Sequence, residues 1–348
     1  MKLFLCSLAA LLVTACIPEF PEDTALVDSP RVLAIRAEAA EAAPEQSVKL
    51  SVLVAAPPGV AIPTPNWAFC SARKPLAELG PVASDCLLPE SAGFTTREAI
   101  GSGLDAEASL TKDACRQFGP IRPEPKPGQP AGRPVDPDVT GGFYQPVVLE
   151  LGSEVALGSV RLICGLTGLP REESVKYNAQ YRANTNPVID ELKATEGGAP
   201  VSIRSAQSGE KELTLHKGSS VELSALFASC PSEPICGDGV CSAIESKEEC
   251  GEDCNLQRGC SGAEEYTWFN PVTRVVEQRR ESVVASWFAT GGSFGAQRTG
   301  NSGAEGARSA LSNRYIAPMQ VGPQTLWIVL RDDRGGVGWQ TLNILVQD

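Results

Sequence analysis

Two segments of this chain carry nearly the same alternating pattern, and this repetition constrains the fold more than any other feature. SVKLSVLVA at 47–55 alternates polar and apolar residues, and so does SSVELSALF at 219–227. Each follows a turn and a short apolar opening, VLAIRAEA at 32–39 and VIDELKA at 188–194. Period-two alternation over this length is typical of half-buried β-strands. The repetition therefore predicts two copies of one β-sandwich unit.

Turn signals divide the two copies and close the second one. Asn184-Thr185-Asn186-Pro187 is typical of a turn, so we place the first unit at 30–185 and the second at 186–348. Asp333-Arg334-Gly335-Gly336 predicts a hairpin that leads into the last strand. Strands are predicted at 30–37, 47–55, 67–70, 144–151, 160–165 and 174–183 in the first unit, and at 188–194, 211–215, 220–227, 265–269, 282–289, 325–330 and 339–346 in the second.

The first unit contains a long stretch without a regular pattern. Residues 71–145 are expected to be irregular and pinned by Cys86 and Cys115. Within them, residues 119–138 are proline-rich and cannot form the interior of a strand or helix. The region is therefore predicted to be a long surface excursion from the sandwich.

The first sixteen residues have the features of an export signal with a lipid attachment site. Lys2 precedes an apolar run that is too short to span a membrane. The run ends in Leu-Val-Thr-Ala-Cys16, which resembles the bacterial lipobox, in which the cysteine is lipidated and becomes the mature N-terminus. An ordinary cleaved signal with a chance cysteine is the alternative. We expect a signal peptide at 1–15, lipid on Cys16, and an extended lipidated tether at 16–29.

These expectations define the compartment and limit the partners. Ile17 follows Cys16, which by analogy with lipoprotein sorting favours an outer-membrane lipoprotein held at the membrane by its lipid anchor. The net charge of −12 argues against nucleic acid and anionic lipid surfaces as partners, because both are bound through basic patches. Another envelope protein or a glycan remains as the expected partner.

The cysteine count fits an oxidising compartment. Of twelve cysteines, Cys6 leaves with the signal peptide and Cys16 takes lipid. The even number that remains predicts up to five disulfides, with the pairing left open. The ten disulfide candidates are Cys70, Cys86, Cys115, Cys164, Cys230, Cys236, Cys241, Cys250, Cys254 and Cys260.

Six of these cysteines define a cysteine-rich insert at 230–260 within the second unit. Its centre has the spacing C-x4-C-x8-C-x3-C and resembles small bacterial disulfide repeats of the form CGDGxC…E…C…DC. A disulfide knot in place of an apolar core is the first interpretation. The second adds calcium, with Asp238, Glu245 and Asp253 as hard oxygen ligands. The third, a tetrathiolate zinc site, fits less well because short C-x2-C pairs are missing and thiolates oxidise in this compartment.

The sequence offers little of the machinery of an enzyme. His216 is the only histidine, and its place before a turn predicts an exposed strand end. The formal G-x-S-x-G match at 291–295 lies upstream of a glycine-rich segment, so it predicts a loop and not the strand-to-helix turn of a hydrolase. The acid pairs Glu264-Glu265 and Asp332-Asp333 are interpreted as solvated turn residues.

Five tryptophans could stack on sugars, although tryptophans within such strands are usually core residues. We expect Trp287 and Trp327 to be core residues, and Trp339 less so because it lies beside the hairpin. The full set is Trp67, Trp268, Trp287, Trp327 and Trp339.

The blocks ESVVASWFATGGSFGAQRTG at 281–300 and TLWIVLRDDRGGVGWQTLNILV at 325–346 resemble immunoglobulin- or PKD-like repeats in lipoproteins of myxobacteria and their relatives. The opening at 31–50 resembles the first domain of those proteins. The resemblance implies a fold and a location, and it implies no activity. The expected fold is mainly β, with two Ig-like β-sandwich domains in tandem, the second carrying the small cysteine-rich insert.

The expected function is a non-catalytic surface, structural or adhesion module of the cell envelope. Its predicted contact surfaces are residues 71–145, the insert at 230–260 and a Gly/Ser loop at 291–313. The alternative is a calcium-dependent carbohydrate-binding surface protein. No other cofactor is expected.

Overall fold

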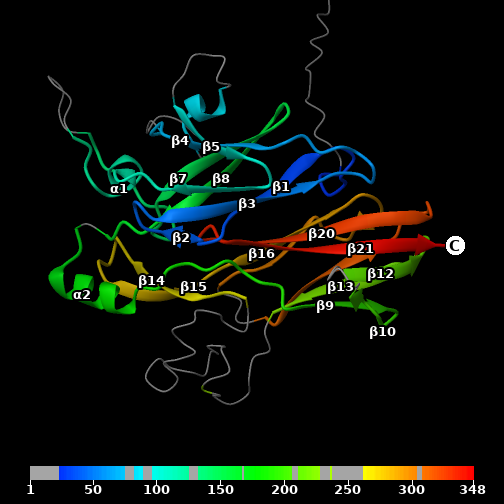
Figure 1. Cartoon of the computed structure of the whole chain (residues 1–348). Coiled ribbons are helices and arrows are strands. Elements are labelled where there is room, and N and C mark those ends of the chain that lie inside the picture. Colours follow the sequence, from blue (N-terminus) through cyan, green and yellow to red (C-terminus); the bar gives the residue numbers. More distant parts are fainter. Residues whose placement is uncertain are drawn as a thin grey trace, which may run out of the picture.

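The alternating segments form the strands of two β-sandwiches that lie one against the other (Figure 1). The computed structural model describes residues 23–74, 82–88, 96–124, 132–166, 168–205, 211–227, 236, 262–303 and 308–348. Strands β1–β8 make up unit 1, and β9–β21 make up unit 2. The predicted fold class, mainly β with two sandwiches, is confirmed.

Unit 1 has one sheet with the order β1–β3–β6 and a second with the order β2–β8–β7–β4–β5. Its strands are β1 (Arg31–Ala37), β2 (Glu41–Ala42), β3 (Ser47–Ala55), β4 (Asn66–Cys70), β5 (Arg97–Ser102), β6 (Asp105–Ser109), β7 (Tyr144–Leu151) and β8 (Glu154–Leu162). Two short helical segments, η1 (Ser84–Leu87) and α1 (Ala114–Gln117), lie between β4 and β7.

Unit 2 has sheets with the orders β10–β9–β13–β19–β17 and β11–β12–β21–β20–β16–β18. Its strands are β9 (Glu191–Glu196), β10 (Ala199–Val201), β11 (Arg204–Ser205), β12 (Lys211–His216), β13 (Ser220–Leu226), β16 (Val283–Ala289), β17 (Ser293–Phe294), β18 (Arg298–Asn301), β19 (Ala310–Ile316), β20 (Gly322–Asp332) and β21 (Val337–Gln347). A separate hairpin, β14 (Glu265–Phe269) with β15 (Val276–Arg280), stands apart from both sheets.

The two units share one strand order. The series β1–β3–β6 corresponds to β9–β13–β19, and β2–β8–β7–β4–β5 corresponds to β12–β21–β20–β16–β18. Even the parallel pair recurs, as β2 with β8 and as β12 with β21. This is the A–B–E and A′–G–F–C–C′ arrangement of the immunoglobulin sandwich. Both units are therefore immunoglobulin-like sandwiches.

The repetition seen in the sequence extends to the register of the first strand pair. When 47–55 is aligned with 220–228, the residues that face one another across β1 and β3 match those across β9 and β13. The matched pairs are Ile35–Val52 and Ala37–Leu50 in unit 1, and Leu192–Ala225 and Ala194–Leu223 in unit 2. Because a slip of one residue would turn every side chain to the other face, the shared register places equivalent residues in both cores.

Each core contains a tryptophan on the equivalent central strand. Trp67 on β4 and Trp287 on β16 are both fully buried, and each indole N–H donates a hydrogen bond. Trp67 donates to the Gly103 carbonyl at 2.8 Å, and Trp287 donates to Thr299 Oγ1 at 2.9 Å. A buried tryptophan on this strand is a hallmark of the immunoglobulin fold.

Several predicted elements are wrong. Residues 174–183 do not form a strand: α2 (Arg171–Gln180) is a helix, with Pro170 before it and acidic residues in its first turn. The strand predicted at 160–165 begins earlier, at Glu154. The region 71–145 also contains the strands β5 and β6, one in each sheet of unit 1, whose mostly exposed residues give no strong pattern.

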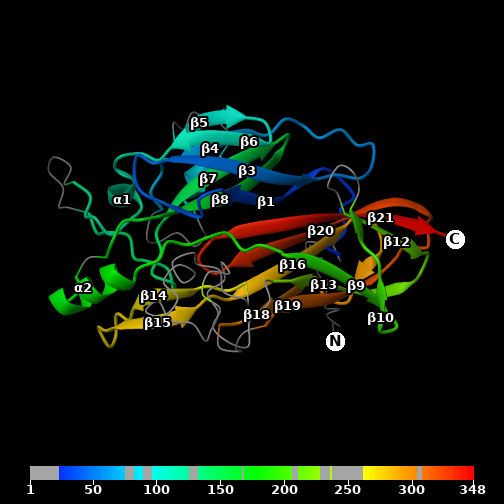
Figure 2. The same cartoon turned by 60° about the horizontal axis from the view of Figure 1, so that its bottom comes forward.

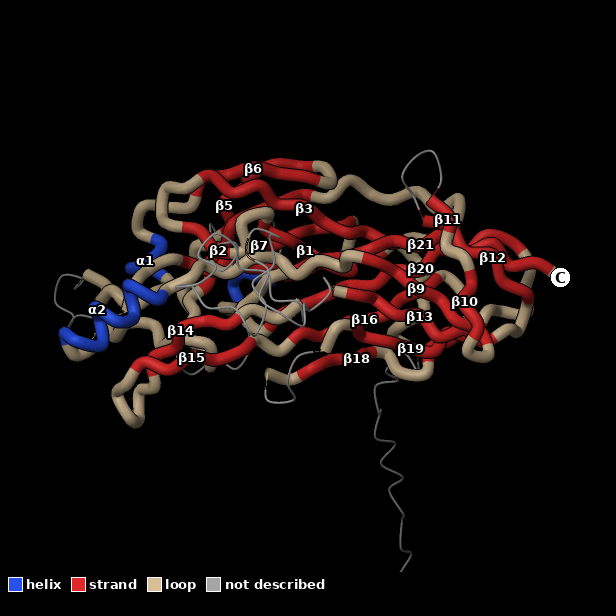
Figure 3. The backbone as a smooth tube through the Cα atoms, turned by 90° about the horizontal axis from the view of Figure 1, so that it is seen from below, coloured by secondary structure: helices blue, strands red, loops and turns tan. Residues whose placement is uncertain are grey.

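Unit 2 departs from expectation in two places. The segment 265–269 belongs to the separate β14–β15 hairpin, and the expected loop at 291–313 contains β17, β18 and half of β19. The hairpin lies next to α2 at one end of the molecule, opposite the C-terminus (Figure 3). In the described part of the chain, α2 is the longest helix with ten residues, and no helix is long and apolar enough to cross a bilayer.

The segment before β1 is held against unit 2. Val27 N–H donates to the Ala289 carbonyl at 2.8 Å, and Ala289 N–H donates to the Ala25 carbonyl at 3.0 Å. Of the tether predicted at 16–29, residues 25–27 therefore form a short parallel bridge along the end of β16. Figure 2 shows the sandwich of unit 1 above that of unit 2.

Candidate functional site

The most elaborate constellation of side chains lies at the junction between the two units. Its apolar part is formed by the outer face of β20 and β21 against β1 and β3. Trp327 belongs here: it is a buried core residue, as predicted, and the core that it joins lies between the units. The buried residues of this apolar junction are Val27, Leu33, Ala34, Ala55, Trp327 and Val329.

Two arginines tie the same faces together. Arg331 Nη2 donates to the Leu33 carbonyl at 2.6 Å. The Arg36 guanidinium carbon lies 4.1 Å from the ring centroid of Trp339, a cation–π contact between β1 and β21. Full burial of a valine or leucine side chain contributes roughly 1.5–3 kcal/mol, so the apolar junction alone favours one fixed arrangement of the units.

The charged part of the junction is built around the β20–β21 turn. Asp332 Oδ1 accepts hydrogen bonds from the backbone N–H groups of Arg334 and Gly336 at 2.9 and 2.7 Å. Gly335 has a φ of +97°, a conformation that glycine adopts without strain. A Cβ at Gly336 would lie 2.1 Å from Asp332 Oδ2 and 2.8 Å from the Thr185 carbonyl, so only glycine fits there. The turn predicted from Asp333-Arg334-Gly335-Gly336 is thus packed against the linker between the units, residues 181–190.

Arg334 is the centre of this charged junction, with a side chain only 1% exposed. Its Nη1 lies 3.1 Å from Glu281 Oε1 and 3.6 Å from Glu264 Oε2. Its Nη2 lies 3.4 Å from Glu41 Oε2 on β2 of unit 1 and donates to the Arg182 carbonyl at 2.9 Å. One guanidinium group from unit 2 therefore contacts unit 1, the linker and two carboxyl groups of its own unit.

A second buried arginine supports Glu41 from within unit 1. Arg161 on β8 lies beside Glu41, with Nε 3.5 Å from Oε1, and its Nη1 donates to Thr140 Oγ1 and to the Tyr144 hydroxyl. A Cβ at Gly142 would lie 2.2 Å from Arg161 Nη1, so the glycine leaves room for the guanidinium group. Glu41 is thereby held between two arginines.

The linker residues complete the junction. Asn184 N–H donates to Glu41 Oε2 at 2.8 Å, and its Nδ2 donates to Asp332 at 3.3 Å. The Thr185 hydroxyl donates to Glu264. Asn186 Nδ2 donates to the Ala37 carbonyl, and its Oδ1 accepts from Val337 N–H. Every residue of Asn184-Thr185-Asn186 therefore contacts a unit by its side chain, and the boundary predicted there is a fixed connection.

The junction holds more carboxyl groups than guanidinium groups. Burial raises the pKa of Glu264 to about 7. Burial, followed by the charges of Asp332 and Glu264, raises the pKa of Glu281 well above its usual range. Burial also raises the pKa of Asp332, against hydrogen bonds from Gly336 and Asn184 that lower it. These three groups therefore retain protons at a pH at which exposed carboxyl groups have lost them.

The two acid pairs are divided between solvent and the junction. Glu265 is exposed and pairs with Arg280 at 2.9 Å. Glu264 and Asp332 are buried, so their interpretation as solvated turn residues is wrong. The pattern of adjacent acids does not reveal this, because the sandwich turns one member inward and leaves the other outside.

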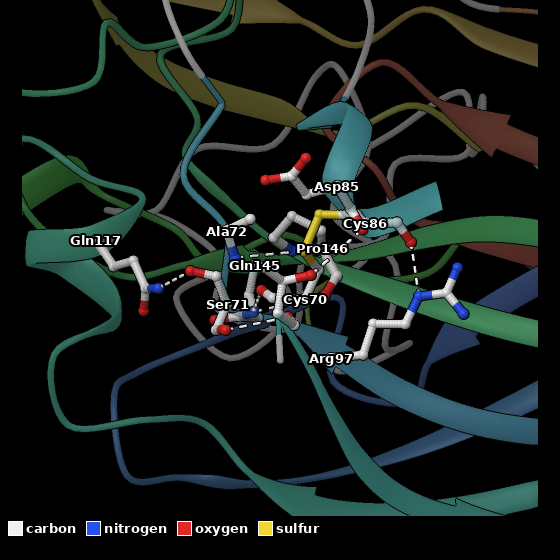
Figure 4. The surroundings of a disulfide bond; sticks show 10 residues. Cys70, Ser71, Ala72, Asp85, Cys86, Arg97, Gln117, Gln145 and Pro146 are labelled. Atoms are coloured by element: carbon white, nitrogen blue, oxygen red, sulfur yellow. Dashed lines mark hydrogen bonds between the residues drawn. A yellow bond between two sulfur atoms is a disulfide. The ribbon is translucent and has the colours of Figure 1, made fainter. Parts of the chain in front are cut away.

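Two disulfides lie in unit 1, and four of the ten candidate cysteines are thereby shown to be paired. Cys70 at the end of β4 is bonded to Cys86 in η1, and Cys115 in α1 is bonded to Cys164 after β8. Figure 4 shows the first of them, where Gln145 Nε2 donates to the Cys70 carbonyl and Arg97 Nε donates to the Cys86 carbonyl, both at 2.8 Å. The region 71–145 is thus attached to the sandwich at Cys86 and Cys115, the two positions predicted to pin it.

Other predicted site residues lie outside the described residues. These are Cys16 with its lipid, the calcium ligands Asp238, Glu245 and Asp253, and Cys230, Cys241, Cys250, Cys254 and Cys260 of the insert. Cys236 is described and is disulfide-bonded. Among the described residues, no group of three or more histidine, cysteine or acidic side chains is arranged to hold a metal ion.

The two candidate catalytic features have ordinary structural roles. His216 ends β12 and is exposed, as predicted, with Nδ1 2.6 Å from the Asp348 carbonyl oxygen. Ser293 lies in the short strand β17, which pairs with β19, and none of the described residues after it forms a helix. The G-x-S-x-G match therefore does not form a nucleophile elbow.

Arg334, Glu41, Arg161 and Glu281 were not predicted to be functional. Arg334 stands in a turn signal, and arginine in a turn is usually solvated. The sequence feature that could have indicated burial of Arg334 is the pair of glycines that follows it. Two glycines after an arginine in a turn allow the backbone to pack closely against another segment.

No known protein family and no curated protein matches the sequence. Among solved structures, a chimeric titin Z1Z2 tandem matches at 10% identity over 92% of this chain and 100% of that chain, with a TM-score of 0.20. The fibronectin(III)-like modules of Clostridium thermocellum CbhA match at 6% identity over 93% and 92% of the two chains, with a TM-score of 0.20. The tandem V-type regions of VCBP3, a v-region-containing chitin binding protein, match at 12% identity over 91% and 100%, with a TM-score of 0.21. These sequence identities and TM-scores are too low to support a fold assignment. The immunoglobulin-like fold is therefore assigned from the strand order described above.

Proposed function

We propose that this chain is an exported, lipid-anchored envelope protein that acts as a non-catalytic structural or adhesion module. The observation that carries the proposal is the junction: two immunoglobulin-like units are fixed to one another by an apolar face, a buried ion-pair network and a linker held by its side chains. Domains within one chain usually move relative to each other unless their interface is large and well packed. A fixed pair of such sandwiches suits a protein that presents a surface at a set distance and angle.

Three further features support the proposed location. Immunoglobulin-like sandwiches occur in many cell-surface proteins, where they bind through surfaces and loops. The disulfides of unit 1 are of the kind that forms and persists in oxidising compartments. The lipobox-like sequence before Cys16 supports anchoring at the outer membrane.

The anchor is tested in the producing bacterium with the full chain and the variant Cys16→Ser. The wild-type protein is expected to incorporate labelled palmitate and to fractionate with the outer membrane, and the variant is expected to do neither. A wild-type protein that takes up no label and is released from the membrane would overturn the lipid anchor.

The adhesion or structural role is tested by comparing cells that carry the wild-type protein, no protein, or the Cys16→Ser variant. Surface attachment or envelope integrity is expected to fall in the second and third strains. Equal behaviour of all three strains, or catalytic turnover by the purified protein in a broad hydrolase screen, would contradict the proposal.

A further inference from the structure

The charged junction combines buried carboxyl groups with too few positive partners. Arg334 and Arg161 face Glu41, Glu264, Glu281 and Asp332, so full ionisation leaves two negative charges in excess. All six side chains are buried. An unpaired charge in such a place is costly, and a buried group responds by keeping its neutral form.

The three carboxyl groups of unit 2 depend on one another. Glu281 Oε2 accepts a hydrogen bond from the Glu264 backbone N–H at 2.9 Å, and its Oε1 accepts from Arg334. Glu264 has the same guanidinium group at 3.6 Å. Arg334 also contacts Glu41, and that contact crosses to unit 1. A carboxyl group of unit 2 that becomes charged therefore competes with unit 1 for Arg334 and repels Glu41.

The groups that face this cluster come from every neighbouring element. From unit 1 they are Glu41 on β2, Asp138 before β7, Tyr144 on β7 and Arg161 on β8. From α2 and the linker they are Tyr177 and Tyr181. From unit 2 they are Glu264 and Tyr266 at β14, Arg279 on β15, Glu281 before β16, and Asp332, Asp333 and Arg334 at the β20–β21 turn.

We propose that the charged junction is a pH-dependent latch between the two units. With protons on the carboxyl cluster, Arg334 is available to Glu41 and unit 1 is closed onto the β20–β21 turn. Loss of those protons draws Arg334 to unit 2, places like charges against Glu41, and loosens this charged contact, while the apolar junction keeps the units together and both sandwiches remain folded.

The direction of the pH dependence follows from the raised pKa values. The closed junction binds more protons than the open one, because opening exposes the Glu264 carboxyl group and returns its pKa from about 7 toward 4.5. Stabilisation of the closed form is therefore complete at a pH below about 4.5 and is lost as pH rises through 7. Each proton released on opening changes the opening equilibrium by about tenfold per pH unit.

Amide hydrogen exchange on the full chain between pH 5 and 8.5 tests the latch, with rates corrected for intrinsic exchange. The reporters are the N–H groups of Asn184, Arg334 and Gly336, which donate to Glu41 and Asp332. The N–H of Ile328 in the core of unit 2 reports global unfolding. Protection of the three junction amides is expected to stay below that of Ile328 and to fall by about tenfold or more between pH 6 and 8. Junction protection that equals that of Ile328, or that does not change with pH, would overturn the proposal.

The variant Glu264→Gln identifies the group responsible. Glutamine keeps the size of the side chain and can donate to the Thr185 hydroxyl, which rotates to accept, while its carbonyl faces Arg334. The pH dependence of junction protection is expected to become several-fold smaller, and Glu222→Gln, on the exposed face of β13, should leave it unchanged. If Glu264→Gln fails to fold, Glu281→Gln serves in its place. A folded variant at either position that keeps the full wild-type pH dependence would refute the assignment.

Discussion

The two units have the same strand order but are stabilised differently. Among the described residues, the main core of unit 1 contains 16 buried apolar residues and that of unit 2 contains 23; unit 1 also has a smaller buried cluster around Cys70 and Cys86. The last two strands of unit 2 are eleven residues each, whereas their counterparts in unit 1 have eight and nine. Unit 1 has two disulfides within its described residues. The described strands of unit 2 contain no cysteine, and the disulfide-bonded Cys236 belongs to its insert. The comparison indicates that covalent links offset a smaller core within one fold.

The largest expected effect comes from removing the longer disulfide loop. Cys115→Ser combined with Cys164→Ser opens a loop with a sequence separation of 49 residues and is expected to destabilise unit 1 by about 4 kcal/mol. Hydrogen exchange measured unit by unit would report the loss in β7 and β8, with β20 and β21 much less affected. Equal losses of protection in both units would contradict the conclusion that this disulfide stabilises unit 1.

The second prediction compares equivalent core residues. Leu50→Ala in unit 1 and Leu223→Ala in unit 2 truncate buried side chains at matching register positions, and each is expected to cost about 3 kcal/mol with disulfides intact. Under reducing conditions only Leu50→Ala should unfold its unit at room temperature. Chemical denaturation with and without reductant measures this, and an identical response of the two variants to reductant would count against a role for the disulfides in unit 1.

The third prediction concerns the two core tryptophans. Trp67→Phe and Trp287→Phe should each cost about 2 kcal/mol, from lost volume and a lost hydrogen bond. The loss should be larger for Trp67, because it leaves the carbonyl of Gly103 without its donor, whereas the Thr299 hydroxyl can rotate to another partner. Thermal unfolding of both variants tests the order, and a larger loss for Trp287→Phe would reverse it.

The smallest expected effect lies at the contact between the units. Arg36→Gln removes the cation–π contact with Trp339 and should cost about 0.5–1 kcal/mol. The loss should appear in both units, because the contact joins them. Lys193→Gln, at an exposed position on β9, is the control and should have no effect. A loss confined to unit 1 would show that Arg36 stabilises only its own strand.

The fold was accessible from the sequence where patterns are periodic. Alternation in 47–55 and 220–227 placed both sandwiches, because one buried face per strand imposes period two. Helix α2 was missed because its outward Val175 and buried Tyr177 mimic alternation over a short window. The strands β5 and β18 were missed because edge strands are largely exposed and carry little apolar signal.

The junction could not be predicted from the sequence, because the residues that form it are far apart in the chain. Arg334 and Glu41 are separated by 293 residues, and nothing local distinguishes a buried arginine in a turn from a solvated one. Their burial results from packing the outer face of one sandwich on another, and neither sandwich alone determines that arrangement. Trp327 shows the same difficulty: its position in a strand predicts that it is buried but does not predict which unit packs against it.

The bridge between residues 25–27 and Ala289 determines how mechanical load enters the molecule. These residues precede unit 1 in the chain, yet their backbone hydrogen bonds are made to β16 of unit 2. A force applied upstream of residue 23 would therefore load unit 2 first, and β1 would bear it only after this bridge had separated. The unit nearest the N-terminus in sequence is thus the second to be strained, and the short bridge acts as the first element to yield.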